Sequence, residues 1–321
     1  MYKPPYQITE YIIKLIASVS EKIGEVNALH LYKPAAELRK RNRIKTIQSS
    51  LEIEGNTLTE EQITALFDNK RIMAPAKDIL EVQNAIEVYD QLKTFHPENM
   101  KDLTRAHAML MKGLVDKAGK FRTSNVGTVK GSEIAHLAPG GLMVKSLMND
   151  LFKYLKNHDD LILIKSCVFH YEFEFIHPFT DGNGRMGRLW QTIILMQQYP
   201  VFEYLPVESL IKEYQNEYYS KLSESDKSGH STPFIEFMLT LIEESLRQLL
   251  QSQNTPLTVK DRILLFKAKI TGRKFSRKDY LQNFKNISAP TASRDLKWAV
   301  ENNILNKSGE QRLTEYQFKD L

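Results

Sequence analysis

Twelve consecutive residues bring together the side chains of this chain that are best able to do chemistry. They combine an imidazole, a carboxylate, a glycine-rich turn and two guanidinium groups, in the order His177-Pro178-Phe179-Thr180-Asp181-Gly182-Asn183-Gly184-Arg185-Met186-Gly187-Arg188. An imidazole, with a reference pKa of about 6.5, can remove a proton at neutral pH, a carboxylate can hold Mg²⁺, and guanidinium groups bind phosphate oxygens. The set predicts a site that binds a polyphosphate and a divalent metal and deprotonates a hydroxyl.

The segment before this motif, Leu161–Ile176, is apolar around most of a helical wheel. Such a helix is typical of the buried centre of an all-α domain. Pro178 disfavours helical geometry at His177, so the helix is expected to end there and to present the imidazole in a loop.

After the loop, helical spacing of apolar residues resumes over Arg185–Gln198. Gly182 and Gly184 permit positive φ and close approach of main-chain N–H groups to a ligand. The start of a helix offers unpaired N–H donors and the positive end of its dipole. The loop and helix together therefore predict a phosphate site. A capped structural loop is the competing interpretation, and it suits a lone histidine or arginine better than this whole set.

The twelve residues resemble the motif of Fic-domain proteins, His-Pro-Phe-x-Asp-Gly-Asn-Gly-Arg-x-x-Arg, and match it at every specified position. The resemblance implies transfer of AMP from ATP to a hydroxyl side chain of a target protein. A related toxin subgroup carries lysine at the second motif glycine and phosphorylates instead, and Gly184 argues against that variant. The roles implied are a general base at His177, a Mg²⁺ ligand at Asp181, a phosphate loop of Gly182, Asn183 and Gly184, a phosphate contact at Arg185 and a γ-phosphate contact at Arg188.

Upstream, a helix expected at about residues 42–55 contains Ser50 and Glu54, and Gly55 suits the position that ends a helix. Before a Fic core this pattern resembles the inhibitory helix of many family members. The resemblance pairs Glu54 with Arg188, which would keep the γ-phosphate of ATP from its seat. One carboxylate on a bidentate arginine is a physically reasonable competitor for a phosphate.

Between these features, Gly119–Arg122 and residues 126–139 lack helical periodicity and predict a short hairpin. In Fic proteins this region is a flap that pins the target segment by main-chain pairing, a mode that does not reveal the target. Pro139-Gly140-Gly141 departs from the common family form, in which two prolines often stand. An ordinary connecting hairpin is the alternative interpretation.

Composition is compatible with this prediction. The chain has 321 residues, of which 42% are hydrophobic, enough for a sizeable core and for two or three domains. The single cysteine, Cys167, is expected as a buried thiol. Residues 1–6 lack the apolar core of a secretory signal, and no apolar run approaches the roughly 18 residues of a membrane span. These features predict a cytoplasmic protein that does not contact a membrane.

The expected fold is all-α, with a Fic-type helical core, a β-hairpin flap and a C-terminal winged-helix domain. The expected domains are residues 1–95, which carry the inhibitory helix, residues 96–251, which form the catalytic core, and residues 256–321. Ser252–Pro256 is expected as a polar linker. Further helices are predicted at Val144–Asn157, Glu208–Leu222 and Pro233–Leu250, and Asn56–Thr59 is expected to cap the helix that follows it.

Residues 256–321 contain 14 Lys and Arg against 7 Asp and Glu, a net charge of +7, whereas the whole chain carries +5. Their pattern resembles a winged helix-turn-helix, whose third helix enters the DNA major groove. The resemblance implies leading DNA contacts at Thr291, Ser293 and Arg294 and a wing contact at Arg312. Winged helices also serve as protein-interaction modules, so both partners remain open.

Two classes of function fit these features. One is a self-restrained AMP transferase that uses ATP and Mg²⁺, and the other is a DNA-binding regulator whose Fic core only senses nucleotide. The presence of both His177 and Asp181 favours the enzyme, because a sensor has little use for a base or a metal ligand. Similar proteins also remove AMP, and Glu54 could then orient water. The expected partners are a target protein with an acceptor hydroxyl, the chain itself, DNA and a second copy of the chain.

Overall fold

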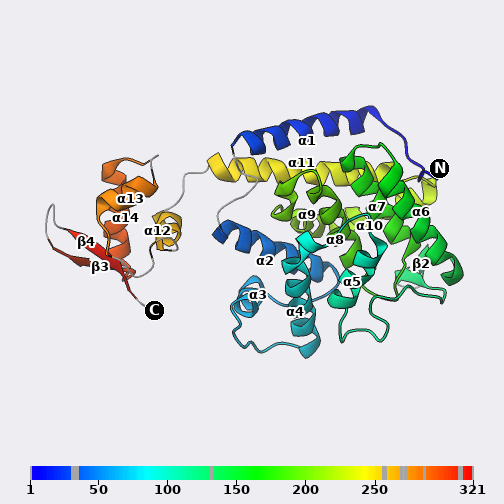
Figure 1. The fold of residues 1–321 in the computed structure, drawn as a ribbon, viewed down its shortest axis with the longest axis horizontal. Helices are drawn as coiled ribbons and strands as arrows, with labels where there is room; N and C mark the ends of the chain where they lie inside the picture. The colour runs from blue at the N-terminus through cyan, green and yellow to red at the C-terminus, as the bar shows by residue number, and fades with distance from the viewer. Residues whose placement is uncertain are drawn as a thin grey trace. The chain divides into compact units, whose positions relative to one another are not determined.

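The computed structural model is mostly helical and contains two compact units, Met1–Leu250 and Gln251–Leu321 (Figure 1). The structure describes residues 2–29, 36–130, 133–254, 259–267, 270, 274–284, 287–309 and 314–319. The predicted helical fold class is confirmed. Among the described residues, no helix combines the length and apolarity needed to cross a bilayer.

The first unit is built from helices joined by short connections. The helices are α1 (Glu10–Ala28), α2 (Ala36–Ile53), α3 (Glu60–Phe67), α4 (Ala76–Asp90), η1 (Leu92–Thr94), α5 (Met100–Leu110), η2 (Gly141–Met143), α6 (Val144–Asn157), α7 (Ile162–Ile176), α8 (Asn183–Met196), η3 (Pro200–Glu203), α9 (Val207–Glu213), α10 (Gln215–Ser228) and α11 (Thr232–Asn254). The strands β1 (Gly127–Lys130) and β2 (Glu133–Leu137) form the predicted antiparallel hairpin between α5 and α6.

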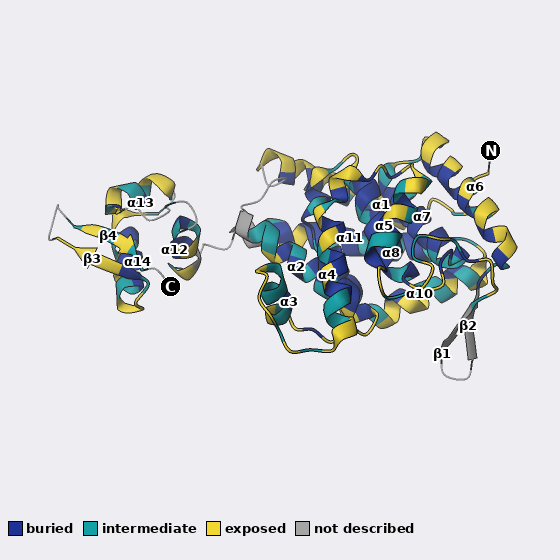
Figure 2. Ribbon diagram, turned by 60° about the horizontal axis from the view of Figure 1, so that its bottom comes forward, coloured by how far each residue is buried: buried dark blue, intermediate teal, exposed yellow. Residues whose placement is uncertain are grey.

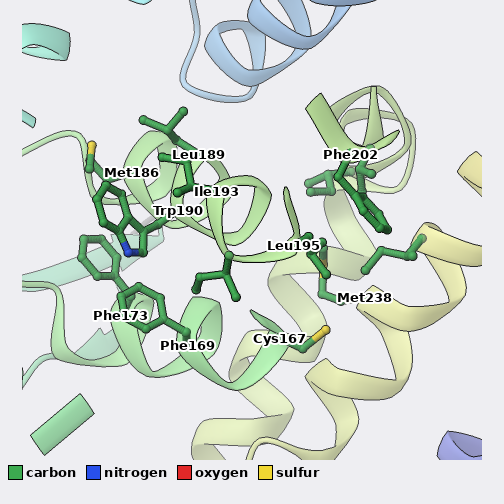
Figure 3. Close-up of a cluster of buried hydrophobic side chains, with 14 of the residues drawn as sticks. Cys167, Phe169, Phe173, Met186, Leu189, Trp190, Ile193, Leu195, Phe202 and Met238 are labelled. Atoms are coloured by element: carbon green, nitrogen blue, oxygen red, sulfur yellow. The ribbon is translucent and has the colours of Figure 1, made fainter. Parts of the chain in front are cut away.

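The core of this unit lies where α7 packs against α8. Phe169 and Phe173 of α7 lie close to Met186 and Trp190 of α8 (Figure 3), and all four side chains are buried. Most residues of both helices are buried, as the colouring of the ribbon shows (Figure 2). Cys167 belongs to the same core as a fully buried thiol, as predicted, and burial raises its pKa to about 12. The apolar helix expected over Leu161–Ile176 is therefore α7, the buried centre of this unit.

The helix α1 runs along α11, the helix that ends this unit (Figure 1). Tyr11 and Thr240 share a hydrogen bond of 3.1 Å between their hydroxyls, and Lys22 Nζ lies 3.2 Å from the Glu243 carboxylate. Buried residues of α1 and α2 belong to the same hydrophobic cluster as those of α7 and α8. The N-terminal helices and the motif therefore share one core.

Three predicted helix boundaries were wrong. The motif helix begins at Asn183, two residues before the predicted start, because Gly182 already adopts the cap position with φ of 81°. The helix expected over Glu208–Leu222 is two helices, since Tyr214 has ψ of 32° and interrupts them. The second of these continues through polar residues to Ser228, where the left-handed Gly229 caps it.

The predicted polar linker Ser252–Pro256 was also partly wrong. Residues 252–254 continue α11, which ends at Asn254 and not at Leu250. A polar sequence without proline or glycine does not by itself end a helix, because glutamine and serine pay only a small helix-propensity cost.

The second unit contains α12 (Val259–Lys267), α13 (Arg277–Asn283), α14 (Ala289–Glu301), β3 (Leu305–Ser308) and β4 (Glu315–Phe318). The two strands pair antiparallel, and Phe275 bridges to Tyr316. Ser276 and Ser288 cap α13 and α14 with their side chains. This element order agrees with a winged helix, which stays a prediction for this unit.

Candidate active site

His177 stands at the end of α7 in a left-handed conformation, with φ of 49° and ψ of 61°. Its main-chain N–H donates to the Phe173 carbonyl at 2.9 Å, and Pro178 follows, so the helix ends as the sequence predicts. Left-handed geometry costs a non-glycine residue roughly 1–2 kcal/mol. Contacts elsewhere in the site must therefore offset this cost.

The loop after His177 is closed by Asn183. The Asn183 side chain accepts from the Phe179 main-chain N–H at 2.9 Å and donates to the Phe179 carbonyl at 2.9 Å. Asn183 is 2% exposed. Its side chain therefore shapes the loop from within, and what it can offer a ligand is its main-chain N–H at the start of α8.

Of the two glycines that permit positive φ, Gly182 adopts it, with φ of 81°. Gly184 lies in the first turn of α8 with helical geometry. The reason for a glycine there is space, because a Cβ at position 184 would overlap the Glu54 carboxylate and would lie 3.1 Å from Nη1 of Arg188. No side chain caps α8 at Gly182. The first N–H groups of the helix are thus suited to receive an anion.

A second histidine, His107 of α5, contacts this loop through a ring stack and a hydrogen bond. Its ring stacks on Phe179 with centroids 3.6 Å apart and an interplanar angle of 9°. The Gly119 N–H donates to Nδ1 at 2.8 Å, so the neutral ring carries its proton on Nε2 and donates to the Asp181 carbonyl at 3.0 Å. Burial lowers the pKa of His107 to about 4 and keeps the ring neutral.

Arg188 and Glu54 form the ion pair that the sequence analysis expected. Arg188 is 2% exposed, and its Nη2 donates to Glu54 Oε1 at 2.7 Å and to the Ser50 carbonyl at 2.9 Å. Its Nε donates to Ser50 Oγ at 3.2 Å. Burial acts to lower the pKa of Arg188, but Glu54, together with Tyr218 and Glu174, more than offsets burial, and the pKa is raised. The buried cation is therefore held by the end of α2.

Gly55 ends that helix by the geometry the sequence predicts. It has φ of 93°, and its N–H donates to the Glu52 carbonyl at 3.1 Å. The Asn56 N–H donates to the Leu51 carbonyl at 3.1 Å, which completes a Schellman turn. The turn fixes Glu54 directly after Ile53, the last residue of α2.

Arg185 is also buried, and it has a partner that the sequence analysis did not find. Its Nη1 lies 3.2 Å from the Glu81 carboxylate of α4, and its Nη2 lies 3.2 Å from Asp181. The other Glu81 oxygen accepts from the Asn56 side chain at 2.8 Å. One carboxylate therefore joins the end of the Glu54 helix to a predicted phosphate ligand.

Comparison with known proteins agrees with this geometry. Residues 97–195 match the model of the Fic/DOC family. A Fic family protein from Desulfovibrio desulfuricans G20, known from a crystal structure, is 40% identical, with a TM-score of 0.77 over 99% of this chain and 98% of that chain. The chain belongs to the Fic family. The resemblance stated from the motif is thereby confirmed.

Curated relatives of this Fic protein include enzymes. It is 28% identical over 249 residues to protein adenylyltransferase Fic of Nematostella vectensis, and the match covers 72% of this chain and 56% of that protein. It is 25% identical over 256 residues to protein adenylyltransferase fic-1 of Caenorhabditis elegans, covering 75% of this chain and 48% of that protein. The chain spans about half the length of the curated relatives it matches.

Three of the four residues predicted to contact DNA lie in or beside the first turns of α14. Thr291 and Ser293 are partly exposed, and Arg294 is exposed. Arg277 of α13 donates to Ser293 Oγ at 2.9 Å. Arg312 lies outside the described residues, so its predicted role has no structural counterpart here.

Behind Arg188 lies a carboxylate that the sequence analysis also missed. Glu208 of α9 is 2% exposed, and neither of its oxygens has a hydrogen-bond partner among the described residues. It lines a small cavity together with Arg188 and Thr192. Burial raises the pKa of Glu208 to about 7.

We expect Glu208 to make stability depend on pH. Between its unfolded pKa, near 4.3, and its folded pKa of about 7, the native state holds a proton that the unfolded chain has lost, so stability falls as pH rises through this window. Glu208→Gln should therefore raise the melting temperature at pH 8 by about 2–4 °C for each kcal/mol recovered, with little change at pH 4.5. Calorimetry at both pH values measures this.

Glu213→Gln, an exposed carboxylate at the end of the same helix, is the matched control and should shift neither melting temperature. Glu172 also has its pKa raised to about 7, by burial and then by Asp226, so some pH dependence should persist. An equal gain for Glu208→Gln at both pH values would contradict the assignment.

Proposed function

We propose that this Fic protein is a protein adenylyltransferase, which transfers AMP from ATP to a hydroxyl side chain of a target protein. The observation that carries the proposal is the loop that joins left-handed His177 to the uncapped start of α8, the helix that also carries the buried Arg188 guanidinium. The relatives named as protein adenylyltransferases support the same reaction class.

The phosphate chain would lie against the first turn of α8. Left-handed Gly182 leaves the N–H groups of that turn without a side-chain cap, and the helix dipole adds a favourable field. Arg185, held between Glu81 and Asp181, adds positive charge at the same helix end. Arg188 would bind the γ-phosphate once Glu54 leaves it.

The residues present fit a Mg²⁺ ion that accompanies the nucleotide. The Asp181 side chain is 55% exposed at the tip of the loop and offers hard carboxylate oxygens. When bound, the ion would neutralise charge on the phosphate oxygens.

In the proposed step, the target hydroxyl oxygen attacks the α-phosphorus while His177 takes the hydroxyl proton. The bond from the α-phosphorus to the bridging oxygen breaks, and pyrophosphate leaves with those electrons. The β1–β2 hairpin offers main-chain groups that could pair with an extended target segment. Such pairing accepts many sequences, so the target is defined here only as a hydroxyl on an extended segment.

Glu54 would restrain this reaction. Its Oε1 accepts a hydrogen bond of 2.7 Å from Nη2 of Arg188. The carboxylate lies in the space that Gly184 leaves open beside the first turn of α8. A γ-phosphate and this carboxylate would compete for the same donors. The restraint is therefore a competition between two anions for one buried cation.

Glu54→Gly is expected to release the restraint. A hydrogen bond between charged groups is worth about 1.5–3 kcal/mol, which corresponds to roughly a tenfold to hundredfold gain in ATP affinity. Titration calorimetry with ATP measures the affinity, and α-³²P-labelled ATP measures AMP transfer to the protein itself and to proteins of a lysate.

Glu52→Gly makes the same substitution on an exposed residue of the same helix and should leave both readouts unchanged. ATP affinity that stays equal to that of the parent protein in Glu54→Gly would refute the competition.

His177→Ala, made in the Glu54→Gly protein, tests the reaction itself. Loss of the base should lower AMP transfer by about 10²- to 10⁴-fold, while ATP affinity stays within about twofold because the phosphate donors remain. The same labelling and calorimetry measure both quantities. Unchanged transfer would exclude His177 as the base, and binding without any transfer in the Glu54→Gly parent would favour a nucleotide sensor.

DNA binding by the C-terminal unit is a second candidate function. The observation that favours it is the exposed start of α14, where Thr291, Ser293 and Arg294 are accessible beside Arg277. The acidic Asp295 on the same helix is 1% exposed and is paired with Arg262, so it does not offset the exposed cations. A polar, basic helix start of this kind suits phosphate and base contacts.

If DNA is the partner, binding of the full chain to a fluorescent duplex of random sequence should weaken steeply between about 50 and about 200 mM salt, because binding releases counterions from the DNA. Arg294→Ala should reduce the logarithmic salt slope by about one phosphate contact. Lys14→Ala, an exposed lysine of α1, is the control. No binding at the lower salt would favour a protein partner.

A further inference from the structure

Arg122 lies just before the β1–β2 hairpin and is buried, with 3% of its surface exposed. Its guanidinium donates to four main-chain carbonyls. Nε reaches His177 at 2.6 Å and Nη2 reaches Ile176 at 2.9 Å, both at the end of α7. Nη1 reaches Ser124 at 2.7 Å and Nη2 reaches Pro139 at 2.8 Å, on the two sides of the hairpin.

The contacts at α7 stabilise its unusual end. The carbonyls of Ile176 and His177 are among those that a helix leaves without partners, and they form the negative end of its dipole. The Arg122 main-chain N–H also donates to the Pro178 carbonyl at 2.9 Å. Three consecutive carbonyls around the left-handed His177 are therefore bound by one residue.

The contacts at the hairpin close its base. Ser124 precedes β1 and Pro139 follows β2, so the guanidinium holds the two ends of the hairpin together. Asn125 Oδ1 also accepts from the Gly141 N–H at 3.0 Å. A Cβ at Gly141 would overlap the Thr123 main chain, which explains why a glycine stands at this point.

The acceptors of Arg122 make its role specific. All four are carbonyl oxygens of the main chain, and burial lowers the pKa of Arg122. Removing the side chain would take a partner from four carbonyls, of which that of Ile176 is buried and the others are partly buried. Lysine cannot replace it, because its single ammonium group cannot reach acceptors spread around a planar fork.

We infer that Arg122 is a positioning residue that fixes the β1–β2 hairpin relative to the catalytic end of α7. It sets the distance between the main chain that would hold the target segment and the imidazole that would deprotonate the target hydroxyl. The catalytic consequence rests on the proposed transferase function, whereas the positioning itself does not. The four acceptors of Arg122 include neither Glu54 nor any residue of α8 that is proposed to bind the nucleotide.

The first experiment tests the positioning without any reaction. Hydrogen exchange with mass spectrometry compares the full-length protein with its Arg122→Met and Arg122→Lys variants. Exchange of the paired amides of β1 and β2 and of the end of α7 should rise by at least about tenfold in both variants, while α1 and α11 keep their protection. Unchanged exchange in the hairpin would overturn the inference.

The second experiment measures the catalytic consequence in the Glu54→Gly protein, with labelled ATP. Arg122→Met and Arg122→Lys should lower the maximal rate of AMP transfer on the order of 10²-fold, and ATP affinity should stay within about twofold. Arg105→Met is the matched control, because Arg105 also donates to a main-chain carbonyl, that of Thr94, but is exposed and lies away from α7. It should change neither quantity.

The outcomes separate the two hypotheses. If the Glu54→Gly parent transfers no AMP, the transferase proposal fails while hydrogen exchange still decides the positioning. If the parent is active and Arg122→Lys transfers AMP at the parental rate, the inference is wrong. A general structural role would instead lower ATP affinity and protection throughout the unit together, and that result would also overturn it.

Discussion

The left-handed backbone of His177 is the constraint on which the arrangement of the site depends. The buried helix α7 ends at Ile176, and α8 begins at Asn183 after only six residues. Within this short loop His177 stays partly exposed. The geometry is unfavourable for a residue with a Cβ, and it persists because the surroundings overdetermine it. Asn183 closes the loop from inside, His107 supports it through Phe179, and Arg122 binds the carbonyls at its start.

Three buried arginines lie at the site, and they differ in the groups that compensate their charge. Arg122 is neutralised by no carboxylate among its described contacts and is satisfied by carbonyl dipoles, which cannot dissociate. Arg185 sits between two carboxylates, one buried and one exposed. Arg188 holds a single carboxylate from another helix. Arg122, which is bound only by carbonyl dipoles, has a lowered pKa, whereas Arg188, which is paired with a carboxylate, has a raised pKa. The three cations therefore differ in whether dipoles or an opposite charge compensate them.

Local rules were enough to predict much of the fold and the motif. Pro178 ended α7, Gly55 completed a Schellman turn, and Thr59 began α3, because each effect involves residues only a few positions apart. The pairing of Glu54 with Arg188 came from family resemblance, not from spacing.

The partners that were missed are distant in sequence. Glu81 meets Arg185 across 104 positions, and Arg122 meets His177 across 55. Nothing in the local pattern of α4 or α5 separates Glu81 or His107 from an ordinary helix residue. The interruption at Tyr214 also lacked a sequence signal, since neither glycine nor proline stands there.

The glycine at position 184 leaves the space that the Glu54 carboxylate fills. A Cβ at this position would overlap Oε1 of Glu54 and would lie 3.1 Å from Nη1 of Arg188, so any side chain there would require the carboxylate to move. The ion pair between Glu54 and Arg188 therefore depends on a residue that takes no part in it, although 130 positions separate Gly184 from Glu54 along the chain.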